Sequence, residues 1–252
     1  MSPLQPSAFR ASAWLKGLGL ALLDLLFPPR CAGCGRVGVL FCAACQAQIE
    51  PIAPPVCLRC GRPHRGAGLC ADCRRSASCL DEIAAAAVFA GTLRQAIHAF
   101  KYDNGRALAP ILGARLAENW RVARRSADVI IPVPLHAARL AERGNNQSVL
   151  LARILAEATG VPIREDVLVR HKATQQQALL NAAERRANVK DAFICQGDVG
   201  NLRVVLVDDV CTTGSTLEAC AEALRGAGAA SVWALTLARA RWEPGQPAPD
   251  RM

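Results

Sequence analysis

One apolar run followed by two acids and a hydroxyl-rich turn constrains the fold of this chain more than any other stretch. Residues 204–207 are β-branched or aliphatic throughout, which predicts a central strand of a parallel sheet, buried on both faces. Asp208 and Asp209 end the predicted strand, and a helix-forming sequence begins at Leu217. A Gly-containing turn between a strand and a helix directs backbone N–H groups and the helix dipole at one point, where a phosphate binds best. The turn residues are Thr212, Thr213, Gly214, Ser215 and Thr216.

The two aspartates serve a different need from the turn. Carboxylates at the carboxyl end of a strand accept hydrogen bonds from sugar hydroxyls or hold a divalent cation, at the crevice where open α/β sheets bind ligands. The alternative is an ordinary strand-to-helix turn in which Ser215 or Thr213 caps the helix. Paired acids, a phosphate-type turn and suitable flanking elements together favour the ligand site. Cys211 lies inside the turn, where a nearby helix N-terminus is expected to lower the pKa of its thiol.

Eight of the twelve cysteines form four C-x-x-C units. Each unit places two sulfurs on one tight turn, and two units complete the tetrahedral four-thiolate shell that zinc prefers, so we expect two zinc ions. Pairing the units in order predicts one site formed by Cys31, Cys34, Cys42 and Cys45, and a second formed by Cys57, Cys60, Cys70 and Cys73. An interleaved pairing is the alternative.

The expected zinc ions are structural, because closed four-thiolate shells have no open coordination position. A redox function would need a βαβ context that these C-x-x-C units lack. Reduced, metal-bound thiolates are typical of a cytoplasmic protein.

The charge balance points to anionic partners. The chain has 30 basic and 21 acidic residues, a formal net charge of +9, and most of the basic residues are arginine. The guanidinium group binds phosphate and carboxylate bidentately, and the excess also suits a nucleic acid. Aromatic residues make up only 4% of the chain, which leaves little material for stacking single-stranded bases. We therefore expect weak, sequence-independent binding to DNA that falls steeply with salt.

The two ends of the chain differ from its middle. Residues 1–30 carry apolar side chains at helical spacing, but Lys16 and Asp24 interrupt them and no small-residue cleavage site follows. This pattern predicts an amphipathic helix, too short and too charged to span a bilayer, that docks on the protein or on a partner. Peripheral contact with the inner membrane is the alternative. Residues 241–252 are rich in proline and are predicted to be disordered.

The intervening sequence predicts a zinc-binding module over residues 31–76 and an α/β domain over residues 80–240. We expect further strands over residues 83–90, 128–134, 161–169 and 231–237, and helices over residues 92–102, 107–124 and 149–158. A polar cluster over residues 136–147 follows the second strand and is either a second anion site or a solvated helix start. Residues 170–188 are polar and basic, which is typical of a mobile lid or a disordered segment.

Several segments together resemble the ComF family, whose members join a double zinc ribbon to a type I phosphoribosyltransferase-like domain. The segments are LFPPRC, IPVPLH, RLAERGNNQ, LVRHKATQQQ, AERRANVKDAF and LVDDVCTTGSTL. The resemblance extends from about residue 27 to residue 239. Members usually have RGFNQ where this chain has RGNNQ, so Asn145 replaces an apolar residue and local packing is expected to differ. The family is associated with DNA uptake in natural competence.

The resemblance implies a site for phosphoribosyl pyrophosphate (PRPP) with Mg²⁺ bridging its pyrophosphate and ribose hydroxyls. Asp208 and Asp209 would orient the ribose, and the turn of residues 212–216 would hold the 5′-phosphate. The pyrophosphate would lie near residues 132–136, and the basic segment from Arg170 would close as a lid. Further catalytic or ligand-binding positions are Arg143, Arg170, Arg139, Lys172 and Gln177, and His136 and His171 are candidates for proton transfer.

Three functions fit these features. The first is an enzyme that transfers a phosphoribosyl group from PRPP to an acceptor, with catalysis by positioning and by stabilising the leaving pyrophosphate. The second is a protein that senses PRPP or a nucleotide without turnover and binds DNA or a competence helicase. The third is a structural zinc-ribbon adaptor, in which Asp208 and Asp209 have no ligand.

Overall fold

The computed structural model describes residues 28–66, 68–102, 105–123, 125–172, 189 and 191–241. The predicted N-terminal helix, most of the predicted C-terminal tail and most of the predicted lid, with Gln177, lie outside these ranges. In chain order the described elements are α2 (Ala43–Ala47), α3 (Ala71–Arg75), β1 (Glu82–Val88), α4 (Gly91–Tyr102), the 3-10 helix η1 (Gly105–Leu108), α5 (Ala109–Ala123), β2 (Val129–Pro132), α6 (Ala137–Arg143), α7 (Gln147–Thr159), β3 (Leu168–Arg170), β4 (Phe193–Cys195), β5 (Arg203–Cys211), α9 (Ser215–Gly226) and β6 (Ser231–Arg239).

Four parallel strands form the central sheet in the order β1-β6-β5-β2. The apolar run at residues 204–207 lies in β5 and is completely buried. Val205 and Val207 belong to the core on one face of the sheet, whereas Val204 and Leu206 belong to the core on the other. This doubly buried parallel strand confirms the predicted α/β fold class.

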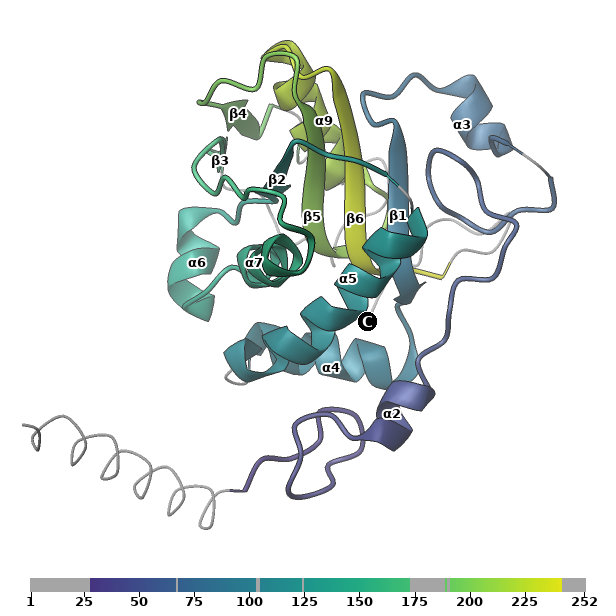
Figure 1. The fold of residues 1–252 in the computed structure, drawn as a ribbon, viewed down its shortest axis with the longest axis vertical. Helices are drawn as coiled ribbons and strands as arrows, with labels where there is room; N and C mark the ends of the chain where they lie inside the picture. The colour runs from purple at the N-terminus through teal and green to yellow at the C-terminus, as the bar shows by residue number, and fades with distance from the viewer. Residues whose placement is uncertain are drawn as a thin grey trace, which may run out of the picture.

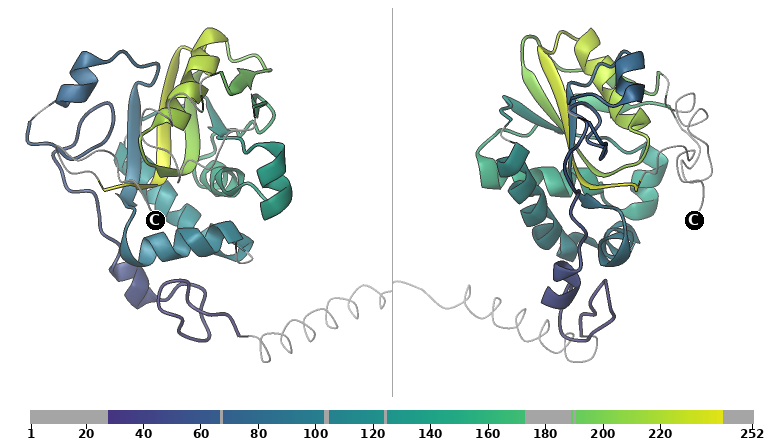
Figure 2. Two further views of the ribbon diagram at one scale, coloured as in Figure 1. Left: turned by 180° about the vertical axis from the view of Figure 1, so that it is seen from behind. Right: turned by 90° about the vertical axis from the view of Figure 1, so that its right-hand side faces the viewer.

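Helices cover both faces of the sheet (Figures 1 and 2). One layer contains α4, α5 and α7, with α5 against β1 and β6 and α7 against β2 and β5. The opposite layer contains α9 and the small antiparallel hairpin of β3 and β4. Since all four central strands are parallel, their carboxyl ends lie along the same end of the sheet, and that end faces α4 (Figure 1).

The zinc-binding region consists of a first cysteine module, residues 31–45, and a second, residues 57–73, which lie at opposite ends of β1 (Figure 1). At the start of β1, Ile83 N donates to Arg59 O of the second module at 2.7 Å. At its end, Val88 N donates to Glu50 O, next to the first module, at 2.9 Å. Thr92 Oγ1 adds a bond to Cys45 O at 2.7 Å. The edge strand of the sheet is therefore the common support of both modules.

The strand β5 is longer than predicted. Its ladder continues past the two aspartates, where Asp208 pairs with Thr236 and Cys211 pairs with Arg239 of β6. A polar residue does not end a strand when the adjacent strand still offers backbone hydrogen-bond partners. Here the adjacent strand β6 continues to Arg239. The aspartates thus lie within a paired strand rather than just after it.

Two further elements differ from prediction. The strand predicted over residues 161–169 is wrong: Ile163 makes an isolated bridge to Ile130, and β3 begins only at Leu168. The charged residues 164–166 between them are exposed or half-exposed, which a continuous buried strand would not allow. Within the predicted polar cluster, α6 is a short helix capped by His136, whose Nδ1 accepts from Ala138 N, and ended by Gly144 in a left-handed conformation.

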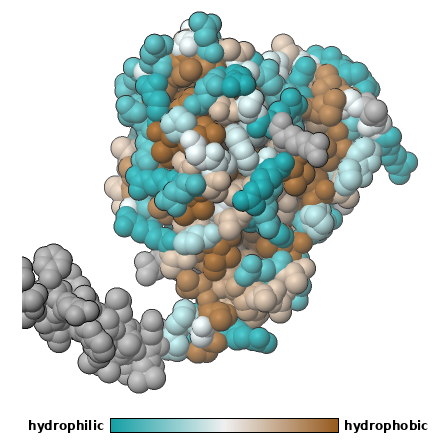
Figure 3. Space-filling model, viewed as in Figure 1, coloured by the Kyte–Doolittle hydropathy of each residue, from teal (hydrophilic) through white to brown (hydrophobic). Residues whose placement is uncertain are grey.

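The surface seen in Figure 3 mixes hydrophilic and hydrophobic residues over its whole visible face, and hydrophobic ones are present at its lower end, over the first cysteine module. Val37 and Val39 of that module are 50% and 39% exposed. Of the helices in the described ranges, none has the length and apolarity that crossing a membrane requires.

Candidate functional site

A cleft of about 320 Å³ opens at the carboxyl ends of β2 and β5. Asp208, Asp209 and the following turn form its floor, residues 133–135 and α6 form one wall, and α4 forms another. The structure therefore brings together residues that are more than 100 positions apart in sequence. Positively charged side chains from several elements line the same cleft as the two acids, namely Arg94, Lys101, Arg139, Arg143 and Arg170.

Asp208 is fixed by two hydrogen bonds to its Oδ1. Ser148 Oγ, at the start of α7, donates at 2.8 Å, and the backbone N–H of Asp209 donates at 2.9 Å. Burial raises the pKa of Asp208 to about 7, and the neighbouring charge of Asp209 acts in the same direction. This carboxyl group titrates near neutral pH, so a nearby cation or hydrogen-bond donor can set its charge.

Asp209 forms an ion pair with Lys101 from α4. Lys101 Nζ lies 2.7 Å from Asp209 Oδ2, and the two side chains are only 22% and 11% exposed. Neither Lys101 nor Ser148 was predicted as a site residue. Both lie on helices whose sequences contain no functional motif. Their role could not be predicted because only the fold places these helices over the end of β5.

The predicted phosphate turn joins β5 to α9 at the bottom of the cleft. Gly214 is the N-cap of α9 and has φ of 87°, a left-handed conformation that a side chain would strain. The interpretation that Ser215 or Thr213 caps the helix is wrong. Instead Ser215 N donates to Thr213 Oγ1 at 3.3 Å, and the two hydroxyl oxygens lie 2.8 Å apart. The N-terminus of the 12-residue α9 therefore lies at the cleft, where Gly214, Ser215 and Thr216 are among the lining residues.

Cys211 differs from prediction. It is the last residue of β5 rather than part of a free turn, and it is 2% exposed. Burial raises the pKa of its thiol, which outweighs the opposite effect of the nearby Arg239. The expected lowering of this pKa is wrong because the sulfur is buried in the apolar core, and burial disfavours the charged thiolate.

Three of the predicted arginines line the cleft. Arg143 lies over the Tyr102 ring, with 5.4 Å between Cζ and the ring centroid, and its Nη1 donates to Gln147 Oε1 at 3.3 Å. Arg170 lies in the same way over Phe193. Burial lowers the pKa of Arg170, and repulsion from the charge of Arg139 lowers it further. Mutual repulsion of this kind indicates a site built to receive an anion.

The unusual Asn145 is accommodated by hydrogen bonds. Its Oδ1 accepts from Gln147 Nε2 at 2.8 Å, and its Nδ2 donates to Arg143 O at 3.3 Å. The next residue, Asn146, caps α7 and donates to Val133 O at 3.0 Å. The polar cluster therefore braces the wall of the cleft.

The other two predicted ligand residues, Lys172 and Gln177, belong to the segment predicted to form a lid. Lys172 is exposed and is not among the residues that line the cleft, and Gln177 lies outside the described residues. His171 is also exposed. The lid role of this segment stays a prediction.

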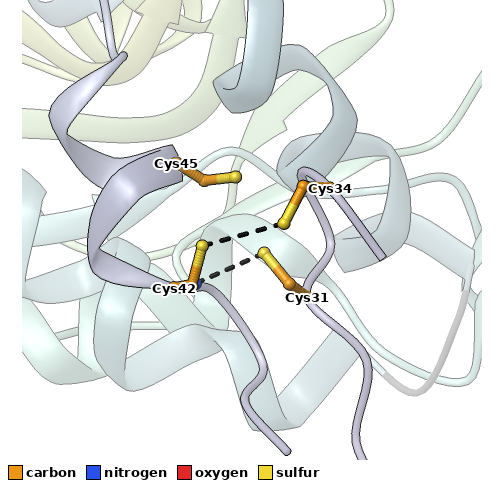
Figure 4. A group of neighbouring side chains, drawn as sticks. All are labelled: Cys31, Cys34, Cys42 and Cys45. Atoms are coloured by element: carbon orange, nitrogen blue, oxygen red, sulfur yellow. Dashed lines mark hydrogen bonds between the residues drawn. The ribbon is translucent and has the colours of Figure 1, made fainter. Parts of the chain in front are cut away.

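The eight C-x-x-C sulfurs form two groups that follow the in-order pairing, Cys31, Cys34, Cys42 and Cys45 in one group and Cys57, Cys60, Cys70 and Cys73 in the other. Within each group the sulfurs lie within 4.8 Å of one another. Figure 4 shows the first group, in which Cys34 Sγ and Cys42 Sγ are 3.8 Å apart and Cys42 N donates to Cys31 Sγ at 3.3 Å.

Both groups fit zinc. Zn–S bonds of about 2.3 Å in a tetrahedron separate the sulfurs by about 3.8 Å. That spacing recurs in the second group between Cys60 and Cys70. There Cys70 N donates to Cys57 Sγ at 3.3 Å, as Cys42 N does to Cys31 in the first group. Each group is thus a closed four-thiolate shell for a structural ion.

Comparison with known proteins gives two family matches. Residues 22–74 match the double zinc ribbon domain, and residues 111–248 match the phosphoribosyl transferase domain. Competence protein F of Haemophilus influenzae is 34% identical over 208 residues, which cover 79% of this chain and 90% of that protein. DNA utilization protein YhgH of Salmonella typhimurium is 32% identical over 77% of this chain and 88% of its own length. Competence protein ComFC of Bacillus subtilis is 26% identical over 79% and 83%.

Proposed function

The chain belongs to the competence protein F family, in which a double zinc ribbon precedes a phosphoribosyltransferase domain, and on that premise we propose that its cleft binds PRPP with Mg²⁺. The observation that carries this proposal is the convergence of two carboxylates, a helix N-terminus and several arginines on one cleft at the carboxyl edge of the sheet. A carboxylate pair suits ribose hydroxyls, and the helix N-terminus suits a phosphate.

Each part of PRPP has a matching group in this cleft. Asp208 and Asp209 would accept hydrogen bonds from the ribose hydroxyls, with Ser148 holding Asp208 in place. The N–H groups and hydroxyls of residues 212–216 would hold the 5′-phosphate. Residues 133–135 follow β2 on the wall of the cleft, where Arg139 and Arg143 would neutralise the pyrophosphate.

The two carboxylates also fit Mg²⁺, which binds through one or two carboxylates together with substrate phosphates. When bound, the ion would offset part of the pyrophosphate charge and so ease its departure. The arginines of the cleft and the ion pair of Lys101 with Asp209 fix the electrostatic environment in which that charge develops.

The reaction that such a site supports is phosphoribosyl transfer. The bond between C1 of the ribose and the pyrophosphate oxygen breaks, a bond from C1 to an acceptor atom forms, and the acceptor loses a proton. The transition state is oxocarbenium-like, so the site would act by orienting the ribose and stabilising the departing pyrophosphate. His136 accepts the capping hydrogen bond of α6 at Nδ1, so Nε2 is the nitrogen that it would use for proton transfer.

A second candidate function is PRPP or nucleotide sensing without turnover, combined with binding to DNA or to a competence helicase. Two observations favour it: relatives are named as competence and DNA utilization proteins, and the net charge of +9 suits a nucleic acid. In either case we propose a role in DNA uptake or utilization, in the reducing cytoplasm that the zinc thiolates need or at the inner face of the membrane.

The test is calorimetric titration of the zinc-loaded protein with PRPP in the presence and absence of Mg²⁺. We expect binding that needs Mg²⁺ and that an Asp208→Asn, Asp209→Asn double variant loses. Glu118→Gln, an exposed acid on α5, is the matched control and should bind normally. The absence of binding to the intact protein would contradict the proposal. Pyrophosphate release on addition of nucleobases would then separate turnover from sensing.

A further inference from the structure

A groove of about 600 Å³ lies between the first cysteine module and the helices α4 and η1. Among its apolar lining residues, Ala32 and Leu40 of the module and Ala99 of α4 are half-buried and pack on the hydrophobic core. The polar side chains of its lining are instead exposed and form its rim, namely Arg30, Gln95, His98 and Tyr102. An apolar floor within a polar rim is the arrangement of a surface that buries an apolar partner.

Hydrogen bonds fix both walls of this groove. Thr92 Oγ1 donates to Cys45 O at 2.7 Å and so ties the start of α4 to the module. Within the module, Ala32 N donates to Leu40 O at 2.8 Å. A partner would therefore meet a preformed surface, which lowers the entropic cost of binding.

The same region exposes large apolar side chains next to the groove. Val37 and Val39 of the module are 50% and 39% exposed, and Tyr102 on the rim is 57% exposed. Val37 also bridges to Arg30 on the rim. These are three of the seven large apolar side chains that are exposed in the described ranges. Such a concentration beside a groove indicates an interface.

The chain itself supplies an occupant beside the groove. Residues 1–27 lie outside the described ranges, and the described chain begins two residues before Arg30 on the rim. In the sequence, Leu18, Leu22 and Leu25 have the spacing of one helical face. An isolated helix of about 14 residues is marginal in water, so it needs a surface on which to pack such a face.

We propose that residues 14–27 form a helix that docks through this leucine face into the groove between the first cysteine module and α4 of the same chain. Only Pro28 and Pro29 separate the segment from Arg30. So short a connection gives the segment a high effective concentration at the groove, which favours its own chain over a second copy or a membrane. The proposal does not rest on PRPP binding.

Photo-crosslinking of the full-length, zinc-loaded protein tests the docking. The photoreactive amino acid p-benzoylphenylalanine replaces Gln95, an exposed residue on the rim. We expect irradiation to link it to residues 14–27, as identified by mass spectrometry. The same replacement of Val122, an exposed residue of α5 that does not line the groove, is the control and should give no such link. A mixture of isotope-labelled and unlabelled protein should show links within one chain only.

Two pairs of substitutions in the segment test its docking face. Leu18→Asp with Leu22→Asp places charges on the proposed face and should lower the yield of the link about tenfold, because buried unpaired charges are costly. Leu20→Asp with Leu23→Asp adds the same charges on the opposite side of the predicted helix and should leave the yield unchanged.

A matched pair of substitutions tests the groove. Ala107 is exposed and lines the groove, so Ala107→Glu should lower the yield of the link as the first leucine pair does. Ala114→Glu, at an exposed alanine of α5 outside the groove, should have no effect. Hydrogen exchange of residues 94–102 gives a readout without a probe, and it should be slower in the parent than in the Leu18→Asp, Leu22→Asp variant.

Four results would overturn the inference. The first is a link between labelled and unlabelled chains, which would make a second copy the occupant. The second is binding of residues 14–27 to phosphatidylglycerol vesicles with loss of the link, which would make a membrane the partner. The third is equal loss of the link in both leucine pairs. The fourth is the absence of a link at position 95 together with equal hydrogen exchange in the parent and the Leu18→Asp, Leu22→Asp variant.

Discussion

At the scale of single residues, the ion pair between Lys101 and Asp209 compensates one of the two acidic charges in the cleft. Breaking a buried pair on one side leaves an uncompensated charge, and here that charge would stand beside Asp208. We expect Lys101→Met to lower the free energy of unfolding by about 2 kcal/mol at pH 7.5, a value reduced from that of a fully buried pair because Lys101 keeps some solvent contact. Urea denaturation measures the change. Lys172→Met, at an exposed lysine, is the control and should have little effect.

Asp208 makes stability depend on pH. Its pKa is about 7 in the folded protein against 3.8 as the ordinary value, so between these two pH values the folded state binds more protons than the unfolded state. The free energy of unfolding therefore falls as pH rises through that window, and the loss is complete above pH 7. Asp208→Asn removes the effect. The variant should be more stable than the parent at pH 8, by on the order of 3 kcal/mol, and similar to it near pH 4.

Thermal unfolding at several pH values checks this prediction. A variant that is less stable than the parent at pH 8 would show that the carboxylate is stabilised by its partners more than it is penalised by burial. The same variant should bind PRPP poorly, so the site would gain stability and lose function by one change.

At the scale of elements, the sequence was sufficient for the parts whose pattern is local. The apolar run of β5, the turn after it and the spacing of the C-x-x-C units each have a direct physical meaning, and the structure places them as expected in a parallel strand, a strand-to-helix turn and two sulfur groups. The end of β5 was misplaced because strand length depends on β6. Lys101 and Ser148 were missed because their role depends on where two helices pack.

The turn between β5 and α9 allows a test at this scale. Gly214 has a positive φ, which a side chain strains even though an added Cβ would meet its neighbours only at ordinary contact distance, so Gly214→Ala should strain the turn by about 1–2 kcal/mol and weaken PRPP binding at least tenfold. Gly226, at the end of the same helix, has open space around it. Gly226→Ala is therefore the matched control and should be neutral in both denaturation and calorimetry, whereas equal effects of the two substitutions would exclude a special role for the turn.

At the scale of the whole molecule, β1 holds one zinc module at each end, so metal and fold are linked. A four-thiolate site does not exist in the unfolded chain, so the free energy of zinc binding contributes directly to the folding of the module around it. Complete removal of zinc by a strong chelator should therefore unfold both modules and lower the melting temperature of the α/β domain, since the edge strand loses its cover. Calorimetry before and after chelation measures the shift, and restored zinc should reverse it. An unchanged melting temperature would show that the α/β domain is independent of its modules.

The charge of the whole chain governs its expected interaction with DNA. A net charge of +9 with 4% aromatic residues favours phosphate contacts over base stacking, so binding should be weak and independent of sequence. Fluorescence anisotropy with labelled oligonucleotides of several sequences measures the affinity between 50 and 300 mM salt. Over this range, about six phosphate contacts would lower the affinity by a factor on the order of 10³ or more.

PRPP added with Mg²⁺ should displace DNA if the arginines of the cleft make those contacts, and should leave DNA bound if basic residues elsewhere make them. Binding that is absent at 50 mM salt, or that survives unchanged at 300 mM, would contradict the electrostatic account, because both depend on counterion release from the same phosphates.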